Sequence, residues 1–333
     1  MGRTPSDVVP TPAGTSALTP GGPAPRTRAD QCPGAWRPWP AADGLLVRLR
    51  VPGGHVSGAA LVALAEVARR HGDGRVRPTS RANLQVRGLP AGPDGRLPAD
   101  VLDEVVATGL LPSPAHDLVR NVMTSPATGL SGGRADLRQV TAELDQRIRA
   151  APDLAELPGR FLFVLDDGRG DLVARSCDLG LVALDAATGQ LRVGEEFTAV
   201  LPLTAAPATL VELAHAFGST RGEGPGAPWH VAELTAGLEH PAARPAPVDP
   251  RVPAAAPALA FGPLGGGWRH VAAPEQGWDT ADLAPWAHLG DLVVTPYSGL
   301  LVPDTPDPPG PPTTRTSPRR PTDPTLSTQE PLA

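Results

Sequence analysis

The sequence is short of cysteine, of lysine and of long apolar runs, and these shortages exclude several classes of protein. Its two cysteines, Cys32 and Cys177, are far apart, which excludes a disulfide framework and a cysteine-rich metal site within one chain. No apolar run approaches the roughly twenty residues needed to cross a bilayer, and no basic segment followed by an apolar one opens the chain. We therefore expect a soluble, cytoplasmic protein with no membrane partner.

The charge balance excludes general nucleic-acid binding. The positive charge is carried by arginine alone, the formal net charge is −6, and the sequence pI is about 5.8. A protein that binds nucleic acid through its overall charge is basic instead. Any site for an anion must therefore be local.

One twelve-residue stretch, 77–88, suits such a local site. If it forms a single extended strand, its side chains alternate between two faces, one small or apolar and one polar. The polar face carries Arg77, Thr79, Arg81, Asn83, Gln85 and Arg87. The stretch contains no carboxylate to neutralise its three guanidinium groups, whose rigid forks of donors match carboxylate or phosphate oxygens. An ordinary half-buried strand with its polar side in solvent is the alternative interpretation.

Residues 31–112 are expected to form a compact α+β unit. The segment 45–51 alternates as a strand, and Ser57 is expected to cap a helix with apolar residues at helical spacing. A second helix is predicted over 98–108. Strand, helix, strand and helix in this order favour a two-layer unit.

Residues 113–241 are expected to form a larger α+β domain. The pattern predicts a helix over 135–150, a buried strand over 161–165, and a hairpin turn over 166–170 that carries Asp166 and Asp167 at a polar tip. The remaining predicted elements are an antiparallel continuation of the sheet at 172–174 and 181–184, and helices at 208–217 and near 230–238.

The rest of the chain is expected to hold a linker, a repeat and two disordered ends. Residues 242–257 are rich in Pro and Ala and predict a linker. Residues 258–304 resemble a degenerate copy of the first unit, in which Thr295 matches Thr79 and Tyr297 takes the place of Arg81. Residues 1–30 and 305–333 have no periodicity and predict disorder.

The pattern Arg-x-Thr-x-Arg-x-x-x-Gln-x-Arg-Gly over 77–88, followed by Arg-Asn-Val at 120–122, resembles the nitrite and sulfite reductase superfamily. Within that group, further phrases are similar to the precorrin-3B synthase family. They lie at 32–35, 42–45, 52–54, 79–85 and 157–168. The resemblance covers about residues 31–304. It implies duplicated ferredoxin-like half-domains around an α+β sulfite-reductase-like domain, with a tetrapyrrole at their interface.

The resemblance also implies a reaction and a set of binding residues. The implied reaction is the hydroxylation of precorrin-3A with O₂ in cobalamin biosynthesis, and an anionic tetrapyrrole would be the partner. By position, the implied binding residues are Arg77, Thr79, Arg81, Asn83, Gln85, Arg87, Arg120, Asn121 and Arg160. No catalytic residue and no metal ligand is assigned.

The resemblance implies a [4Fe–4S] cluster and iron, which relatives hold as siroheme, yet the cluster ligands are not present in this chain. Four thiolates are the usual requirement, and two distant cysteines do not meet it. We therefore interpret the chain as a C-terminally truncated or frame-shifted relative. A cluster-less tetrapyrrole-binding pseudoenzyme, an enzyme served by a separate electron-donor protein, and a nitrite or sulfite reductase are the alternatives.

Overall fold

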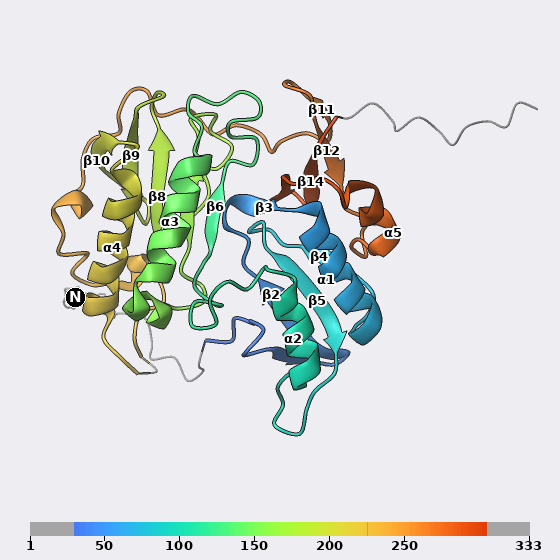
Figure 1. The fold of residues 1–333 in the computed structure, drawn as a ribbon. Helices are drawn as coiled ribbons and strands as arrows, with labels where there is room; N and C mark the ends of the chain where they lie inside the picture. Colours follow the sequence, from blue (N-terminus) through green and yellow to red (C-terminus); the bar gives the residue numbers. More distant parts are fainter. Residues whose placement is uncertain (1–29, 225, 305–333) are drawn as a thin grey trace, which may run out of the picture.

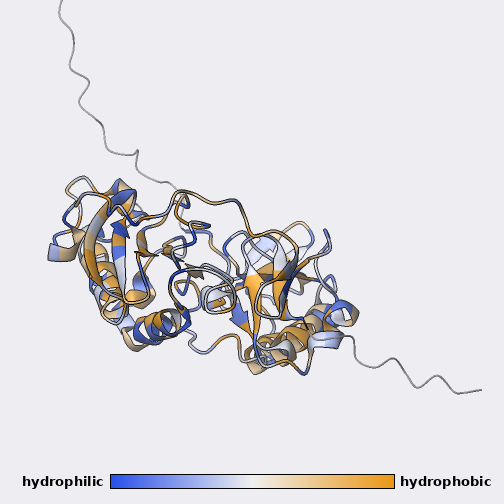
Figure 2. Ribbon diagram, turned by 90° about the horizontal axis from the view of Figure 1, so that it is seen from above, coloured by the Kyte–Doolittle hydropathy of each residue, from blue (hydrophilic) through white to orange (hydrophobic). Residues whose placement is uncertain are grey.

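The structure is a computed structural model that describes residues 30–224 and 226–304. Figure 1 shows two lobes side by side. One lobe holds the middle of the chain, and the other combines the blue N-terminal elements with the orange-red C-terminal ones. Apolar residues gather on the strands of both lobes (Figure 2). The expected disordered ends lie outside the described residues, except for Asp30.

The first sheet is four-stranded and antiparallel, and helices pack against it. Its strand order is β1 (Trp39–Ala41), β2 (Gly44–Leu49), β5 (Leu84–Leu89) and β4 (Val76–Pro78). Helices α1 (Gly58–His71) and α2 (Ala99–Ala107) belong to the same apolar core. Ser57 caps α1 by accepting a hydrogen bond from the backbone N–H of Ala60, as predicted.

The stretch 77–88 is not one strand, and this part of the sequence interpretation is wrong. It folds back on itself, because β4 and β5 pair as an antiparallel hairpin in which Arg77 lies opposite Gln85. Thr79 fixes the turn, since its Oγ1 accepts from the N–H groups of Arg81 and Asn83 at 3.4 and 3.1 Å. Ala82 completes the reversal with a φ of 57°. The polar side chains are therefore divided between two strands and a turn.

A second antiparallel sheet repeats this plan. Its order is β11 (Gly262–Leu264), β12 (Trp268–Ala272), β14 (Gly299–Pro303), β13 (Leu292–Thr295) and β3 (His55–Val56). The turn from β13 to β14 holds Ser298 at a φ of 55°. Ser298 follows Thr295 by three residues, as Ala82 follows Thr79, and these two are the only non-glycine residues with positive φ in the described chain. The backbone thus supports the predicted duplication.

The two repeats exchange edge segments. Strand β3, which precedes α1 of the first repeat, pairs with β13 of the second. In return Trp278, which precedes α5 (Thr280–Leu283) of the second repeat, forms a bridge with Val76 of the first. Trp278 and Leu300 lie in the same apolar core as the residues of α1. The repeats are therefore one structural body.

The middle lobe is a mixed five-stranded sheet. Its order is β10 (Glu196–Pro202), β9 (Thr188–Val193), β8 (Leu179–Ala183), β7 (Phe163–Asp166) and β6 (Val122–Thr124). Helices α3 (Arg138–Ala150) and α4 (Ala206–Arg221) pack with it in a separate core. Phe161 joins sheet and helix, because its ring contacts those of Phe163 and Phe217 at centroid distances of 5.3 and 4.9 Å.

Three local predictions for this lobe are wrong. Strands β7 and β8 are parallel, so 166–170 begins a crossover loop rather than a hairpin turn, and 172–174 is not a strand. The predicted helix near 230–238 is only the 3₁₀ turn η3 (Val231–Glu233). The other 3₁₀ turns are η1 (Pro52–Gly54), η2 (Pro152–Glu156), η4 (Pro241–Ala243) and η5 (Ala284–Trp286). Each of these short turns has a proline within it or a few residues before it. A proline limits the extension of such a turn into a longer helix.

The segment 242–257 is packed on the middle lobe. Its Ala246 donates from its backbone N–H to Phe197 O at 2.9 Å, and its Pro247 O accepts from Gln190 Nε2 at 2.9 Å. Near its end, Ala256 donates to Gly170 O. The predicted linker is thus a strap held by main-chain contacts. None of the described helices is long and apolar enough to span a bilayer.

Candidate functional site

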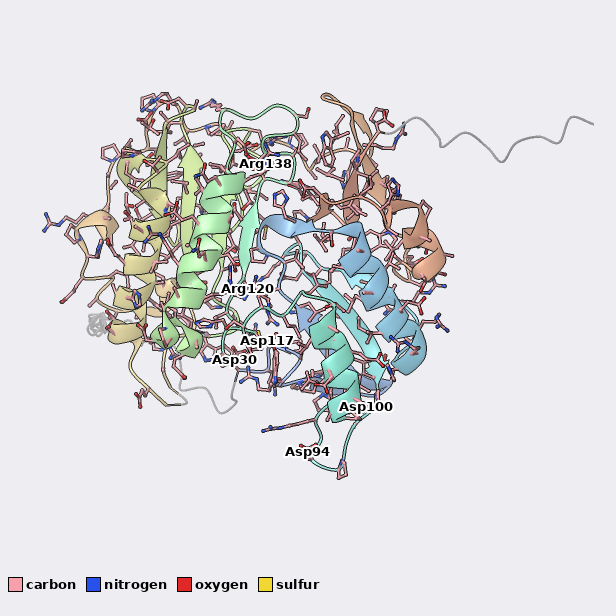
Figure 3. All side chains as sticks on the ribbon, viewed as in Figure 1. Asp30, Asp94, Asp100, Asp117, Arg120 and Arg138 are labelled. Carbon is pink, nitrogen blue, oxygen red and sulfur yellow. The ribbon has the colours of Figure 1, made fainter. Side chains whose placement is uncertain are left out.

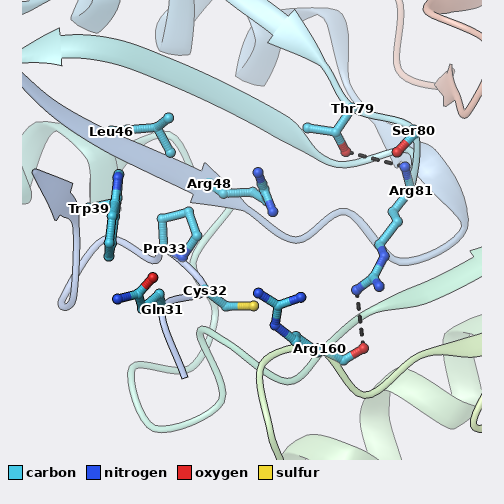
Figure 4. Close-up of a pocket in the computed structure, with 10 residues that line it drawn as sticks. All are labelled: Gln31, Cys32, Pro33, Trp39, Leu46, Arg48, Thr79, Ser80, Arg81 and Arg160. Atoms are coloured by element: carbon cyan, nitrogen blue, oxygen red, sulfur yellow. Dashed lines mark hydrogen bonds between the residues drawn. The ribbon is translucent and has the colours of Figure 1, made fainter. Parts of the chain in front are cut away.

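A cavity of about 410 Å³ lies where the first sheet meets the middle lobe. Three arginines from different parts of the fold reach it: Arg48 from β2, Arg81 from the β4–β5 turn and Arg160 from the loop before β7 (Figure 4). The remaining lining residues are Gln31, Cys32, Pro33, Trp39, Leu46, Thr79 and Ser80. No acidic residue is found among the described residues that line it. The cavity is therefore cationic.

Arg81 ties the two lobes together at this cavity. Its Nη1 donates to the backbone carbonyl of Arg160 at 3.1 Å, across the junction between the lobes (Figure 4). The tight turn around Ala82 places this side chain at the tip of the hairpin. The remaining guanidinium donors can serve a ligand.

The positive charge of Arg48 is destabilised in this cavity. Burial lowers its pKa, and the nearby charges of Arg81 and Arg160 lower it further. Its Nη2 donates to Gln85 Oε1 at 3.2 Å, while its Nε is buried without a hydrogen-bond partner. A carboxylate in the cavity would relieve the repulsion among the three cations.

Arg160 is held loosely over the mouth of the cavity. Its side chain is 47% exposed, its Nε lies 3.9 Å from Asp30 Oδ1, and its guanidinium carbon stands 5.3 Å from the ring centroid of Trp229. The ring restricts the side chain through a cation–π contact without neutralising its charge. Arg160 thus keeps its charge available to a ligand.

Two of the sequence-predicted arginines are neutralised by carboxylates outside the stretch 77–88. Arg77 pairs with Asp73 at 2.7 Å, and Arg87 pairs with Asp43 at 3.0 Å. The sequence of the stretch alone indicated that its arginines have no counter-ions. The structure shows that this is wrong for Arg77 and Arg87. Neither arginine lines the cavity.

Three other predicted residues are buried and hold the structure together. Asn83 Oδ1 accepts from the N–H of Val51 at 3.1 Å, and its Nδ2 donates to Asn121 Oδ1 at 3.1 Å. Asn121 in turn donates to the carbonyl of Gly159 at 2.9 Å. Arg120, at the junction of the lobes in Figure 3, forms a buried pair with Asp145 at 2.6 Å. This network aligns the two lobes around the cavity.

The structure brings Thr79, Arg81 and Arg160 into the cavity and places Gln85 behind Arg48. Arg77, Asn83, Arg87, Arg120 and Asn121 lie outside its lining. Sequence reasoning missed Arg48. The signal was available, because the predicted strand 45–51 alternates and places Arg48 on the face opposite Val47 and Leu49.

An iron–sulfur cluster does not fit the thiols of this chain. Burial raises the pKa of Cys32, with a further rise from Asp30, and burial raises the pKa of Cys177 to about 12. Cluster ligands are thiolates, of which four are usually required.

Asp166, Asp167 and Asp171 place carboxylate oxygens within 4.8 Å of one another. Local contacts account for the first two. Asp166 accepts from the N–H groups of Gly168, Gly170 and Leu172, and Asp167 pairs with Arg169 at 2.6 Å. These contacts shape the crossover loop between β7 and β8, and we assign no metal to it.

Comparisons with known proteins agree with the fold. Residues 40–92 match the family model of the nitrite/sulfite reductase ferredoxin-like half domain. The chain is 32% identical over 164 residues to a precorrin-3B synthase of Sinorhizobium sp, a match that covers 49% of this chain and 34% of the relative. It is 31% identical over 145 residues to a ferredoxin–nitrite reductase of Synechococcus elongatus, covering 41% of this chain and 27% of the relative.

A solved structure shows the same architecture. The NirA protein of Mycobacterium tuberculosis superposes with a TM-score of 0.59 and 20% identity, covering 79% of this chain and 54% of the other. The chain spans about a third or less of the length of these curated relatives and about half of the solved structure. The expected fold class, α+β with duplicated ferredoxin-like half-domains around a larger α+β domain, is confirmed. Residues 40–92 are thus similar to the ferredoxin-like half domain of nitrite and sulfite reductases, and the chain shares sequence similarity with a precorrin-3B synthase and a ferredoxin–nitrite reductase.

Proposed function

We propose that the three-arginine cavity binds an anionic tetrapyrrole of the precorrin class. The observation that carries this proposal is the convergence of Arg48, Arg81 and Arg160 on a space lined by no described acidic residue. A precorrin offers several carboxylates on one ring system, so that it can engage all three guanidinium groups together.

Each residue has a separate part in this binding. Arg48 would donate to one carboxylate of the ligand, and Arg81 would donate to a second one at the junction of the lobes. Arg160 would cover the mouth, with Trp229 restricting its motion. Trp39 and Leu46 supply the apolar surface that the ring system needs.

The reaction we assign to this ligand is the hydroxylation of a precorrin-3A-like substrate with O₂, as an oxidoreductase of the precorrin-3B synthase kind. The similarity to the Sinorhizobium enzyme supports it. Because the two thiols do not fit a cluster, we propose that a separate electron-donor protein provides the electrons. A nitrite or sulfite reductase is the second candidate, which the similarity to ferredoxin–nitrite reductase favours.

The binding proposal is tested by titrating the protein with uroporphyrin III, a stable tetrapyrrole with eight carboxylates, and following its fluorescence. Replacing Arg48, Arg81 or Arg160 by Gln is expected to weaken binding by about tenfold each, because a hydrogen bond to a charged group contributes about 1.5 kcal/mol. Arg147→Gln is the matched control, since Arg147 is exposed on α3 and pairs with Glu143. Equal affinity in all four variants would contradict the proposal.

The two candidate reactions are separated by a second assay. A reductase consumes nitrite or sulfite when a reduced dye supplies electrons. A precorrin-3B synthase-like enzyme instead consumes O₂ only when a precorrin and a donor are both present. We expect the second result.

A further inference from the structure

The structure has a second cavity, of about 210 Å³. Arg81 lines both spaces. The second one is also lined by Cys177, Asp178, Glu195 and His230. None of these four residues is among the binding residues that the sequence indicated.

Asp178 and His230 form an ionisable pair in this cavity, and several hydrogen bonds hold the pair in place. Asp178 is buried, with 2% of its surface exposed, and its two oxygens accept from the N–H groups of Val231 and Leu162 at 2.9 and 2.8 Å. The same carboxylate lies 3.2 Å from Nδ1 of His230. These contacts fix the ring and place its proton on Nδ1, because both carboxylate oxygens are acceptors.

His230 therefore presents Nε2 as its free nitrogen. In the neutral ring Nε2 is an acceptor, and after protonation it becomes a charged donor. The side chain of His230 is 36% exposed, so that a ligand can reach it. Its neighbour Trp229 carries the guanidinium of Arg160 on its ring, which joins the same segment to the first cavity.

The surrounding charges decide which ligand this cavity takes. Arg81 is the cation shared with the first cavity, and Asp178 is occupied by its three donors. Glu195 is largely exposed at 74% of its side chain and lies 3.6 Å from Arg192. The thiol of Cys177 is neutral, since burial raises its pKa to about 12. When His230 is protonated, the second cavity has two cationic donors, His230 and Arg81.

We propose that the second cavity is a pH-gated carboxylate subsite, in which protonated His230 and Arg81 together hold a further acidic side chain of the tetrapyrrole. Asp178 is the positioning residue, because it orients the ring and stabilises the imidazolium. This inference rests on the proposed binding function. It adds a specificity determinant, since a ligand without an acidic group at that position gains nothing from protonation.

The sign of the pH dependence follows from the charge. An anion bound to Nε2–H favours the imidazolium, so affinity is highest when His230 is protonated and declines as the pH rises. We expect uroporphyrin III to bind about tenfold more tightly at pH 6 than at pH 8.

The experiment is a uroporphyrin III titration of the full chain at pH 6 and pH 8, with His230→Gln beside the unaltered protein. His230→Gln is expected to bind equally at both pH values, with the affinity that the unaltered protein has at pH 8. His215→Gln is the matched control, because His215 is also paired with an aspartate, Asp153, but lies outside both cavities. It should retain the full pH dependence.

The outcomes separate this inference from the binding proposal. If the unaltered protein binds and Arg48→Gln weakens it, but His230→Gln keeps the pH dependence, the subsite is overturned and the binding proposal stands. If uroporphyrin III binds at neither pH, both are overturned. Asp178→Asn supplies a second variant, which should lose most of the pH dependence while His230 is still present.

Discussion

Buried ionic groups in this protein have two different tasks, and Arg120 and Asp171 illustrate them. Arg120 and Asp145 form a buried pair that also contacts Arg149 at 3.0 Å. Asp171 lies beside two further carboxylates, accepts from Ser125 Oγ, and has its other oxygen buried without a partner. The first arrangement stabilises the lobe, whereas the second costs free energy at neutral pH.

Replacing Arg120 by Gln is expected to lower the free energy of unfolding by about 3 kcal/mol, because it breaks a buried pair and leaves the Asp145 carboxylate with the more exposed Arg149 as its cationic partner. Urea denaturation measures the loss. Arg147→Gln, on the helix that carries Asp145, should leave stability nearly unchanged. A stable Arg120→Gln variant that no longer binds a tetrapyrrole would show instead that Arg120 is a binding residue.

Replacing Asp171 by Asn is expected to stabilise the protein at pH 7.5. Burial, with the charges of Asp166 and Asp167, raises the pKa of Asp171 to about 6. Because the pKa of Asp171 is higher in the folded protein than in the unfolded chain, where it is near 3.9, its protonation stabilises the fold. This contribution is complete below about pH 3.9 and is lost as the pH rises through about 6. The variant should gain about 2 kcal/mol at pH 7.5. The gain should vanish near pH 4, and a loss at pH 7.5 would contradict this assignment.

At the scale of elements, the packing of α1 against the second repeat depends on one glycine. Gly58 begins α1 with an ordinary helical backbone, but a Cβ there would lie 1.8 Å from the carbonyl oxygen of Trp286. The same helix carries the predicted cap at Ser57. Its entry point is thus fixed by a capping side chain and by a close backbone contact.

Gly58→Ala should destabilise the protein by about 2 kcal/mol, since overpacking outweighs the helix preference of alanine. Gly218→Ala is the matched control, because Gly218 lies in α4 with nothing within 4 Å of an added Cβ. That variant should gain about 1 kcal/mol. Thermal unfolding of both measures the contrast, and a gain in both would show that α1 can shift away from Trp286.

The elements that the sequence could predict are those specified by residues close to one another in the sequence. Ser57 and the apolar spacing of α1 are local signals, as is the alternation that exposes Arg48. The crossover after β7 was missed because its cluster of Asp and Gly is also typical of a hairpin turn. The partners of Arg87 and Arg120 come from 44 and 25 residues away, and no local pattern indicates them. The site was therefore predicted in part. Arg81 and Arg160 line the cavity, as expected. Arg87 and Arg120 form ion pairs with carboxylates instead, and those pairs depend on tertiary contacts.

At the scale of the whole molecule, the two repeats share one core while the middle lobe has its own. Trp278 is buried in the shared core with 1% of its surface exposed. The core of the middle lobe is a separate cluster that includes Phe161 and Phe217. The described part of the molecule therefore has two large apolar cores, and residues from both ends of that part contribute to one of them.

Trp278→Ala should weaken both repeats together, at a cost of about 3–5 kcal/mol for the lost aromatic ring. Hydrogen exchange is the measurement, because it reports opening region by region. Amides of β5 and β14 should lose protection to a similar extent, and amides of β7 and β8 should keep theirs. Loss confined to β14 would show that the repeats open independently.

The exchange of edge segments between the repeats also sets the order of events during synthesis. When residues 31–112 leave the ribosome, Val76 and β3 lack the partners that β13 and Trp278 provide, because those lie beyond residue 277. At about 5–20 residues per second, the first repeat waits on the order of 10–40 s for them. During that interval the middle lobe can fold alone, while the first repeat exposes an apolar surface and an open sheet edge. The nascent chain is then a natural client for chaperones that shield such surfaces.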